Sequence, residues 1–158
     1  MGVVGRSVVF AAAALLAIGP AAAADFASVR VSAGKVLFPL VTKGALAAGR
    51  AEVGAARGIC ALSVEVEPVD DRGWSLYVVT DSPAFDPVDV GKPCGDLYWK
   101  KDEDGPGAYR PLDEGEWLVF DNPEGGRAVV PLDVAVALDW NTPPGRYSLG
   151  VRFLVKPR

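Results

Sequence analysis

Prolines and glycines interrupt this sequence at short intervals, because the chain contains 13 prolines and 18 glycines. Few stretches could form a helix of three turns, since proline removes a helical hydrogen bond and glycine weakens a helix interior. Between these breaks, apolar residues recur at every second position, which is typical of strands with one buried face. We count about seven to nine such segments, with a turn signal roughly every ten residues. The pattern predicts an all-β fold, an immunoglobulin-like antiparallel sandwich.

The best alternation in the first half of the chain lies in residues 60–68. Its inward-facing residues are predicted to be Cys60, Leu62, Val64 and Val66. Residues 74–80 follow the turn-forming residues 70–73, so the two segments are predicted to pair as a hairpin. Residues 27–33 alternate in the same way and are expected to form the first strand of the domain.

Two neighbouring segments are less regular. Residues 35–41 are apolar but contain Pro39, which predicts an edge strand or a bent one. Residues 44–58 are rich in alanine, yet Gly49 and Gly54 interrupt any helix. This second segment is predicted to be irregular or a weak strand.

The last two predicted strands flank a stiff turn at residues 141–145. The inward-facing residues of the first strand are expected to be Leu132, Val134, Val136, Leu138 and Trp140, with Asp133 and Asp139 on the opposite face. Those of the second are expected to be Tyr147, Leu149, Val151, Phe153 and Val155. Pro143 and Pro144 fix the backbone of the turn, and Gly145 permits a positive φ. A tyrosine at 147 can bond its hydroxyl back to the turn, as in a tyrosine corner, so folding alone accounts for this stretch.

The first 24 residues have the features of a secretory signal peptide. Arg6 supplies a positive charge, residues 8–19 form an apolar stretch too short to span a bilayer comfortably, and small residues follow Pro20. We expect cleavage between Ala24 and Asp25, which leaves one domain of residues 25–158. The protein is then exported to the periplasm, the cell surface or the medium. The alternative is that the apolar stretch is a membrane anchor.

The charge of the mature chain argues against nucleic acid as a partner. Without Arg6, 15 basic residues face 20 acidic ones, a net charge of −5. Nucleic-acid binding favours a basic surface instead.

Cys60 and Cys94 are the only cysteines. Two cysteines in an exported chain most often form an intramolecular disulfide, which would stabilise this fold by about 3–4 kcal/mol. Two buried free thiols and an intermolecular bridge are the alternatives.

Several catalytic chemistries are excluded by the residues that the sequence lacks. The chain has no histidine, which removes Ser-His-Asp and Cys-His catalysis and histidine-ligated metals. It also has no glycine-rich phosphate loop, so no cofactor and no metal is expected. Paired acids could still serve a small hydrolase, and the candidates are Asp102, Glu103, Asp104, Asp113, Glu114 and Glu116. Residues 102–105 loosely follow a calcium loop, but solvated turns explain all of these acids more simply.

Four tryptophans are many for a chain of this size. Trp74 and Trp140 fall at inward positions and are predicted to lie in the core. Tyr98, Trp99 and Trp117 are the candidates for a binding surface, on which a glycan could stack.

A tryptophan-ended strand followed by "TPPGRYSLGVRFLV" resembles the last two strands of secreted bacterial immunoglobulin-like domains. Spore-coat-U-like proteins and chaperone–usher pilins have a similar Gly-x-Tyr closing strand. Gly145 is the fourteenth residue from the C-terminus, as a glycine is in many pilins. Pilins have a tyrosine next to last, where this chain has Pro157. The resemblance implies assembly by strand donation, in which an N-terminal segment of one subunit completes the sheet of the next. Residues 27–33 have the alternation for that role as well as for a first strand of their own domain.

These features together predict an exported, non-catalytic structural or adhesive protein of the cell envelope with a protein or glycan partner. One alternative is a pilus or coat subunit that polymerises with copies of itself by strand donation. The other is a carbohydrate-binding module or a small acid-based hydrolase.

Overall fold

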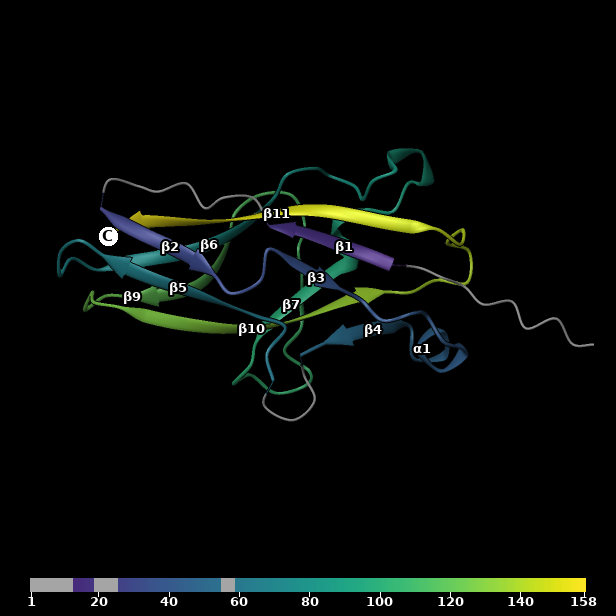
Figure 1. Ribbon diagram of the computed structural model, residues 1–158, viewed down its shortest axis with the longest axis horizontal. Coiled ribbons are helices and arrows are strands. Elements are labelled where there is room, and N and C mark those ends of the chain that lie inside the picture. The colour runs from purple at the N-terminus through teal and green to yellow at the C-terminus, as the bar shows by residue number, and fades with distance from the viewer. Residues whose placement is uncertain (1–12, 19–25, 55–58) are drawn as a thin grey trace, which may run out of the picture.

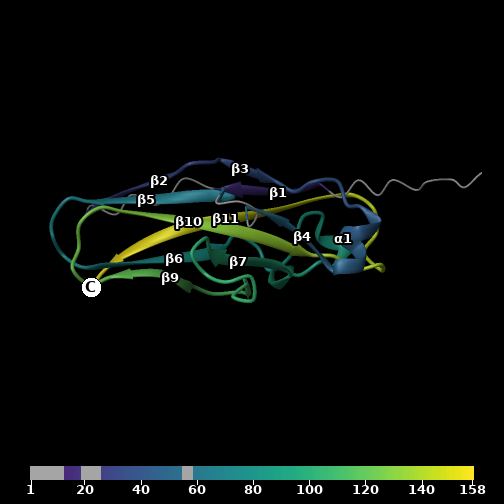
Figure 2. The same cartoon turned by 90° about the horizontal axis from the view of Figure 1, so that it is seen from below.

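The computed structural model describes residues 13–18, 26–54 and 59–158, which form two packed sheets (Figures 1 and 2). The strands are β1 (Ala13–Ile18), β2 (Ala27–Val31), β3 (Lys35–Leu37), β4 (Arg50–Val53), β5 (Leu62–Pro68), β6 (Trp74–Thr80), β7 (Leu97–Lys101), β8 (Arg110–Pro111), β9 (Trp117–Asn122), β10 (Ala128–Ala137) and β11 (Arg146–Pro157). A short helix, α1 (Lys43–Ala48), and two 3₁₀ turns, η1 (Val88–Val90) and η2 (Cys94–Asp96), complete the elements. The predicted all-β sandwich is confirmed. The described residues contain 11 strands, more than expected, because several are only two to four residues long.

Each sheet draws on strands from both halves of the chain. One sheet has the order β3-β1-β11-β6-β9, and the other has the order β2-β5-β10-β7-β8, with β4 also pairing with β10. Strands β4 and β5 occupy successive stretches of the same edge of β10, since β5 pairs with residues 128–132 and β4 with residues 134–137. Every pairing among the described strands is antiparallel except that of β1 with β11, which is parallel.

The core lies between the two sheets and follows the predicted alternation. All five inward positions predicted on β11 are buried, and so are Leu62, Val64 and Val66 of β5. Full burial of one large apolar side chain stabilises a fold by about 1.5–3 kcal/mol. The tightly buried side chains of β5, β6, β10 and β11 therefore account for much of the stability of the sandwich.

The hairpin predicted for residues 60–80 is not formed, because β5 and β6 lie in different sheets. Strand β5 pairs with β2 and β10, whereas β6 pairs with β11 and β9. Both strands bury an apolar face against the opposite sheet, so the turn between them carries the chain across the sandwich. Alternation reveals the buried face of a strand but does not identify its hydrogen-bonded neighbour.

Residues 35–54 partly differ from the prediction. Strand β3 is an edge strand, as expected. The segment from residue 44, which was predicted to be irregular or a weak strand, begins instead in helix α1 and continues as β4. Thr42 caps the helix by accepting a hydrogen bond from Ala45 N at 3.1 Å, and Gly49 ends it with φ 74°. A favourable cap at each end thus permits one short helical piece that the alanine content alone left undecided.

The turn between β10 and β11 confirms the tyrosine corner. The Tyr147 hydroxyl donates to the carbonyl oxygen of Pro143, and burial raises the pKa of that hydroxyl. Gly145 faces the Tyr147 ring, but it lacks the positive φ that the sequence suggested. The prediction of a buried Trp140 is wrong, because β10 ends at Ala137 and Trp140 is 65% exposed.

Candidate functional site

Strand β1 occupies the position between β3 and β11 (Figures 1 and 2). Residues Ala13–Ile18 align in parallel with Arg146–Val151. On the other edge of β1, residues 15–17 pair with β3 in antiparallel register. Strand β3 has no other neighbour in its sheet. We call the position between β3 and residues 146–151 of β11 the strand slot.

The strand that fills the slot comes from the apolar stretch predicted to be part of a signal peptide. The predicted cleavage point between Ala24 and Asp25 lies outside the described residues. Removal of residues 1–24 would take β1 away with them. The same residues cannot be both the cleaved leader that the sequence predicts and a strand of the mature domain.

The two edges of β11 differ in this region. On the edge away from the slot, Ser148 exchanges two backbone hydrogen bonds with Asp86, at 3.0 and 2.8 Å. Next to it, Asp81 N donates to Gly150 O at 2.9 Å. Successive residues of a strand direct their backbone groups to opposite edges, so those of Tyr147, Leu149 and Val151 face the slot and β1. Without an occupant these groups form an open sheet edge, which can accept an extended segment from another chain.

The side chains along the slot specify what can occupy it. Tyr147, Leu149 and Val151 of β11 face the core and are at most 4% exposed, and Val36 of β3 is equally buried. Ser148 and Gly150 alternate with them on the outer face. Residues in register share a face of the sheet, so an occupant needs apolar side chains at the positions opposite the three buried residues of β11.

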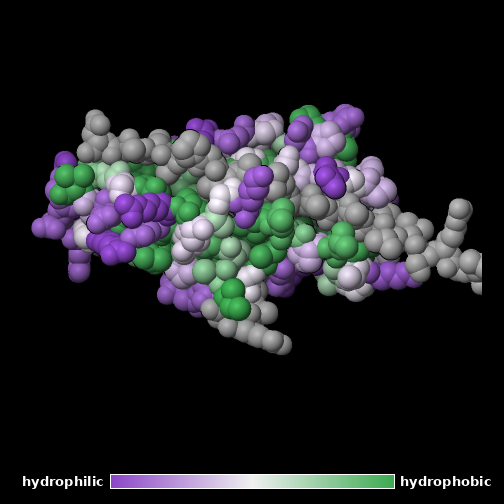
Figure 3. Space-filling model, in the orientation of Figure 1, coloured by the Kyte–Doolittle hydropathy of each residue, from purple (hydrophilic) through white to green (hydrophobic). Residues whose placement is uncertain are grey.

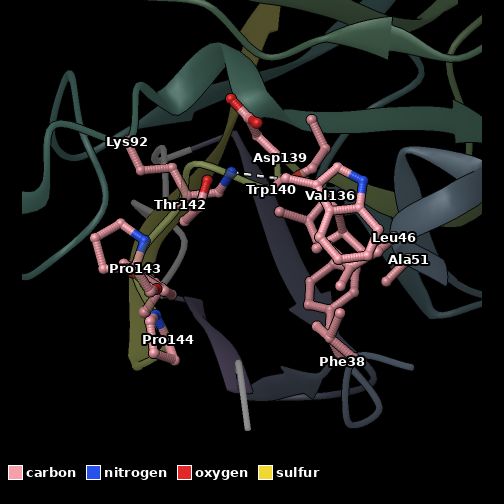
Figure 4. Close-up of a pocket in the computed structure, with 14 residues that line it drawn as sticks. Phe38, Leu46, Ala51, Lys92, Val136, Asp139, Trp140, Thr142, Pro143 and Pro144 are labelled. Atoms are coloured by element: carbon pink, nitrogen blue, oxygen red, sulfur yellow. Dashed lines mark hydrogen bonds between the residues drawn. The ribbon is translucent and has the colours of Figure 1, made fainter. Parts of the chain in front are cut away.

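An apolar pocket adjoins the end of the slot at which β11 begins (Figure 4). Its lining includes Tyr147 of β11, the nearby Phe38, and Pro143 and Pro144 of the turn. The cavity volume is about 50 Å³, and the pocket is partly open to solvent. The exposed Trp140 also lines the pocket, next to the backbone hydrogen bond of 3.1 Å from Thr142 N to Asp139 O.

The predicted disulfide between Cys60 and Cys94 is not formed, and both residues are free thiols. Cys60 precedes β5 on one side of β10, whereas Cys94 precedes β7 on the other side. Cys94 itself lies outside the strands, in η2, where its backbone N donates to Pro83 O at 2.8 Å. Cysteine count and loop length carry no information about which segments lie next to each cysteine.

The aromatic residues proposed as a binding surface are not brought together. Trp99 is only 4% exposed, because it lies in register with Val134 on the inner face of its sheet. Tyr98 and Trp117 are half-buried and lie in different sheets. The Trp117 indole nitrogen donates to Asp113 O at 3.0 Å. Trp140, which the sequence placed in the core, is the most exposed of the four tryptophans.

Four of the six candidate acids, Glu103, Asp113, Glu114 and Glu116, are exposed at the surface. Within residues 13–18, 26–54 and 59–158, no group of three or more Cys, Asp or Glu side chains is arranged to hold a metal ion. Glu103 pairs with Lys101 at 2.7 Å and Glu116 with Lys156, so both acids form ion pairs at the surface. The described residues also include no helix that is long and apolar enough to cross a membrane.

The structure contains a buried ion pair that the sequence pattern does not indicate. Asp133 of β10 was expected on an outer face, yet it is 0% exposed, and Lys100 of β7 is 4% exposed. The two residues are direct neighbours in register, with Lys100 Nζ 2.7 Å from Asp133 Oδ2. Tyr109 lies nearby, with its ring centroid 5.5 Å from Lys100 Nζ, and its pKa is raised to about 12, chiefly by burial and then by the charges of Glu52 and Asp133. The sequence shows a lysine and an aspartate in two apolar strands. It does not show the register that makes them neighbours.

Comparison with protein-family models finds no match, and a search of curated proteins finds no significant match either.

Proposed function

We propose that this chain is an exported, non-catalytic structural subunit of the cell envelope whose sandwich is completed by a strand from another polypeptide. The observation that carries the proposal is the position of β1. A segment with the composition of a signal peptide fills an interior position of a sheet, between β3 and β11. After export, that position needs a new occupant.

Strand addition is the recognition mode that fits such a slot. Main-chain hydrogen bonds give affinity, and alternating apolar side chains give specificity. Once β1 is removed, the slot offers both, since the backbone edge that β1 occupies lies beside the buried residues Tyr147, Leu149 and Val151. The resemblance of residues 140–155 to the closing strands of strand-donating envelope proteins supports the same interpretation.

The direct test supplies the missing strand to the exported protein. The gene is expressed with its own leader, the mature N-terminus is sequenced, and a peptide of residues 11–19 with a solubilising lysine tail is titrated into the purified protein by calorimetry. The proposal predicts an N-terminus at Asp25, binding of one peptide per chain, and a higher thermal midpoint with the peptide than without it. The reference is the full chain, made by cell-free translation without membranes. The proposal is contradicted if the exported chain does not bind the peptide and has the same thermal midpoint as this full chain.

Two peptide variants provide a matched control. Leu15 is in register with Ser148 on the outer face of β11, and Leu16 is in register with the buried Leu149. Leu16→Lys places a charge in register with the buried Leu149 and is expected to abolish binding, whereas Leu15→Lys is in register with Ser148 and is expected to retain it. Equal effects of the two substitutions would show that the peptide binds as a nonspecific apolar segment.

A second candidate function is adhesion at the pocket beside the slot. Trp140 is 65% exposed, and it shares the pocket with the turn prolines and Thr142. An exposed indole beside polar groups suits stacking on a sugar ring. Glycan-array binding by the exported protein that is lost in Trp140→Ala, but retained in Trp117→Ala, would support this role. If the exported protein binds no glycan on the array, this second candidate function is contradicted.

A further inference from the structure

We infer that the mature chain accepts a strand but does not donate its own N-terminal strand, so that the slot is filled by a different polypeptide rather than by a second copy. This inference rests on the proposed function. It concerns the identity of the partner, and it separates a terminal or one-to-one subunit from a self-polymerising one.

The first observation is the position of β2. Residues 27–31, which have the alternation of a donor strand, pair with residues 64–68 of β5 in the same chain. Ala27 is 3% exposed within the core, and Phe26 packs against the core. Additional backbone bonds fix both ends of the segment: Val69 N donates to Phe26 O at 2.7 Å, and Ser32 N donates to Ser63 O at 2.9 Å. Donating this segment to another subunit would open an edge of the six-stranded sheet.

The second observation is the short distance in sequence between the expected cleavage point and β2. After cleavage behind Ala24, only Asp25 and Phe26 precede the strand. A donor arm for the slot must cover six positions, because β1 aligns with all residues from Arg146 to Val151. The mature N-terminus can therefore provide a donor strand only by giving up β2.

The walls of the slot indicate the chemistry of the partner. The partner segment needs apolar residues at alternate positions, opposite Tyr147, Leu149 and Val151. Two exposed cations flank the slot, Arg146 at the start of β11 and Lys35 on β3. Neutral or acidic side chains between the apolar positions would complement these cations. Residues 27–33 carry Arg30 at such an intervening position, which is a further reason to exclude a copy of this chain.

The experiment locks β2 in place. Ser28 and Glu67 are exposed and directly in register between β2 and β5, so a Ser28→Cys/Glu67→Cys variant can join the two strands by a disulfide. The exported protein and its locked variant are compared by light scattering over a hundredfold range of concentration, each with and without the residue 11–19 peptide. A single Ser28→Cys substitution controls for the new thiol.

The inference predicts that both proteins bind one peptide per chain. It also predicts that neither protein forms, at any concentration, an oligomer that prevents peptide binding. The inference would be overturned by oligomers that prevent peptide binding and that form in the unlocked protein but not in the locked variant. In that case β2 would be exchanged between copies. Oligomers of both proteins that prevent peptide binding would overturn it as well, since another part of a second copy would then fill the slot. Failure of both proteins to bind peptide while remaining monomeric instead contradicts the proposed function, because the slot is then not open.

Discussion

Replacing Lys100 with methionine isolates the energy of the buried pair with Asp133. The carboxylate is 0% exposed and its Oδ2 lies 2.7 Å from Lys100 Nζ, which also donates to the carbonyl oxygens of Lys101 and Asp104 at 3.3 and 3.2 Å. Methionine fills similar space without a charge, so Asp133 remains buried without its cation. Breaking one side of such a pair costs about 3–5 kcal/mol. For a domain of this size, that corresponds to a fall of roughly 6–20 °C in Tm.

The assay is urea unfolding of the full chain, followed by tryptophan fluorescence. Lys101→Met is the matched control, because the neighbouring lysine pairs at the surface with Glu103, whose side chain is 70% exposed. We expect it to cost less than about 1 kcal/mol. The double variant Lys100→Met/Asp133→Leu removes both charges and should recover to within about 1 kcal/mol of the parent. The reasoning is refuted if Lys100→Met costs no more than Lys101→Met, or if the double variant is less stable than Lys100→Met alone.

Three further predictions test the remaining features. Tyr147→Phe removes the hydroxyl that donates to Pro143 O and should cost about 1 kcal/mol in the same urea assay, and no measurable loss would contradict a stabilising tyrosine corner. The Tyr109 pKa is raised to about 12 in the folded protein, so the unfolded chain loses that proton first and stability should fall as the pH rises from 10 towards 12. Tyr109→Phe should make this fall shallower, and an unchanged slope would contradict the assignment. Thiol titration of the unfolded, unreduced protein should find two reactive groups per chain, Cys60 and Cys94, whereas none would restore the predicted disulfide.

The local features of the fold could be predicted because each depends on neighbours in sequence. Alternation identified the buried faces of β5 and β11, and the residues after Asn141 predicted the hydroxyl bond of Tyr147. Trp140 was misplaced because an alternating pattern does not show where a strand ends, and β10 ends three residues earlier.

The features that involve distant partners could not be predicted. The assignment of β5 and β6 to different sheets, the separation of Cys60 from Cys94, and the pairing of Lys100 with Asp133 all depend on the order of the strands. Alternation carries no information about that order. The strand slot does not follow from the sequence for another reason: residues 8–19 have the composition of a leader, and that composition does not predict a strand.

Hydrogen–deuterium exchange at residues 146–151 tests the strand slot most directly. In the full chain these residues lie beside β1, whereas on the opposite edge Ser148 N donates to Asp86 O. The account predicts protection of this segment in the full chain and fast exchange, in the exported chain alone, of the amides that face the slot, those of residues 147, 149 and 151. Protection of these amides should return once the residue 11–19 peptide or the natural partner binds. Equal protection in the full chain and in the exported chain alone would show that the sandwich is complete without a donated strand.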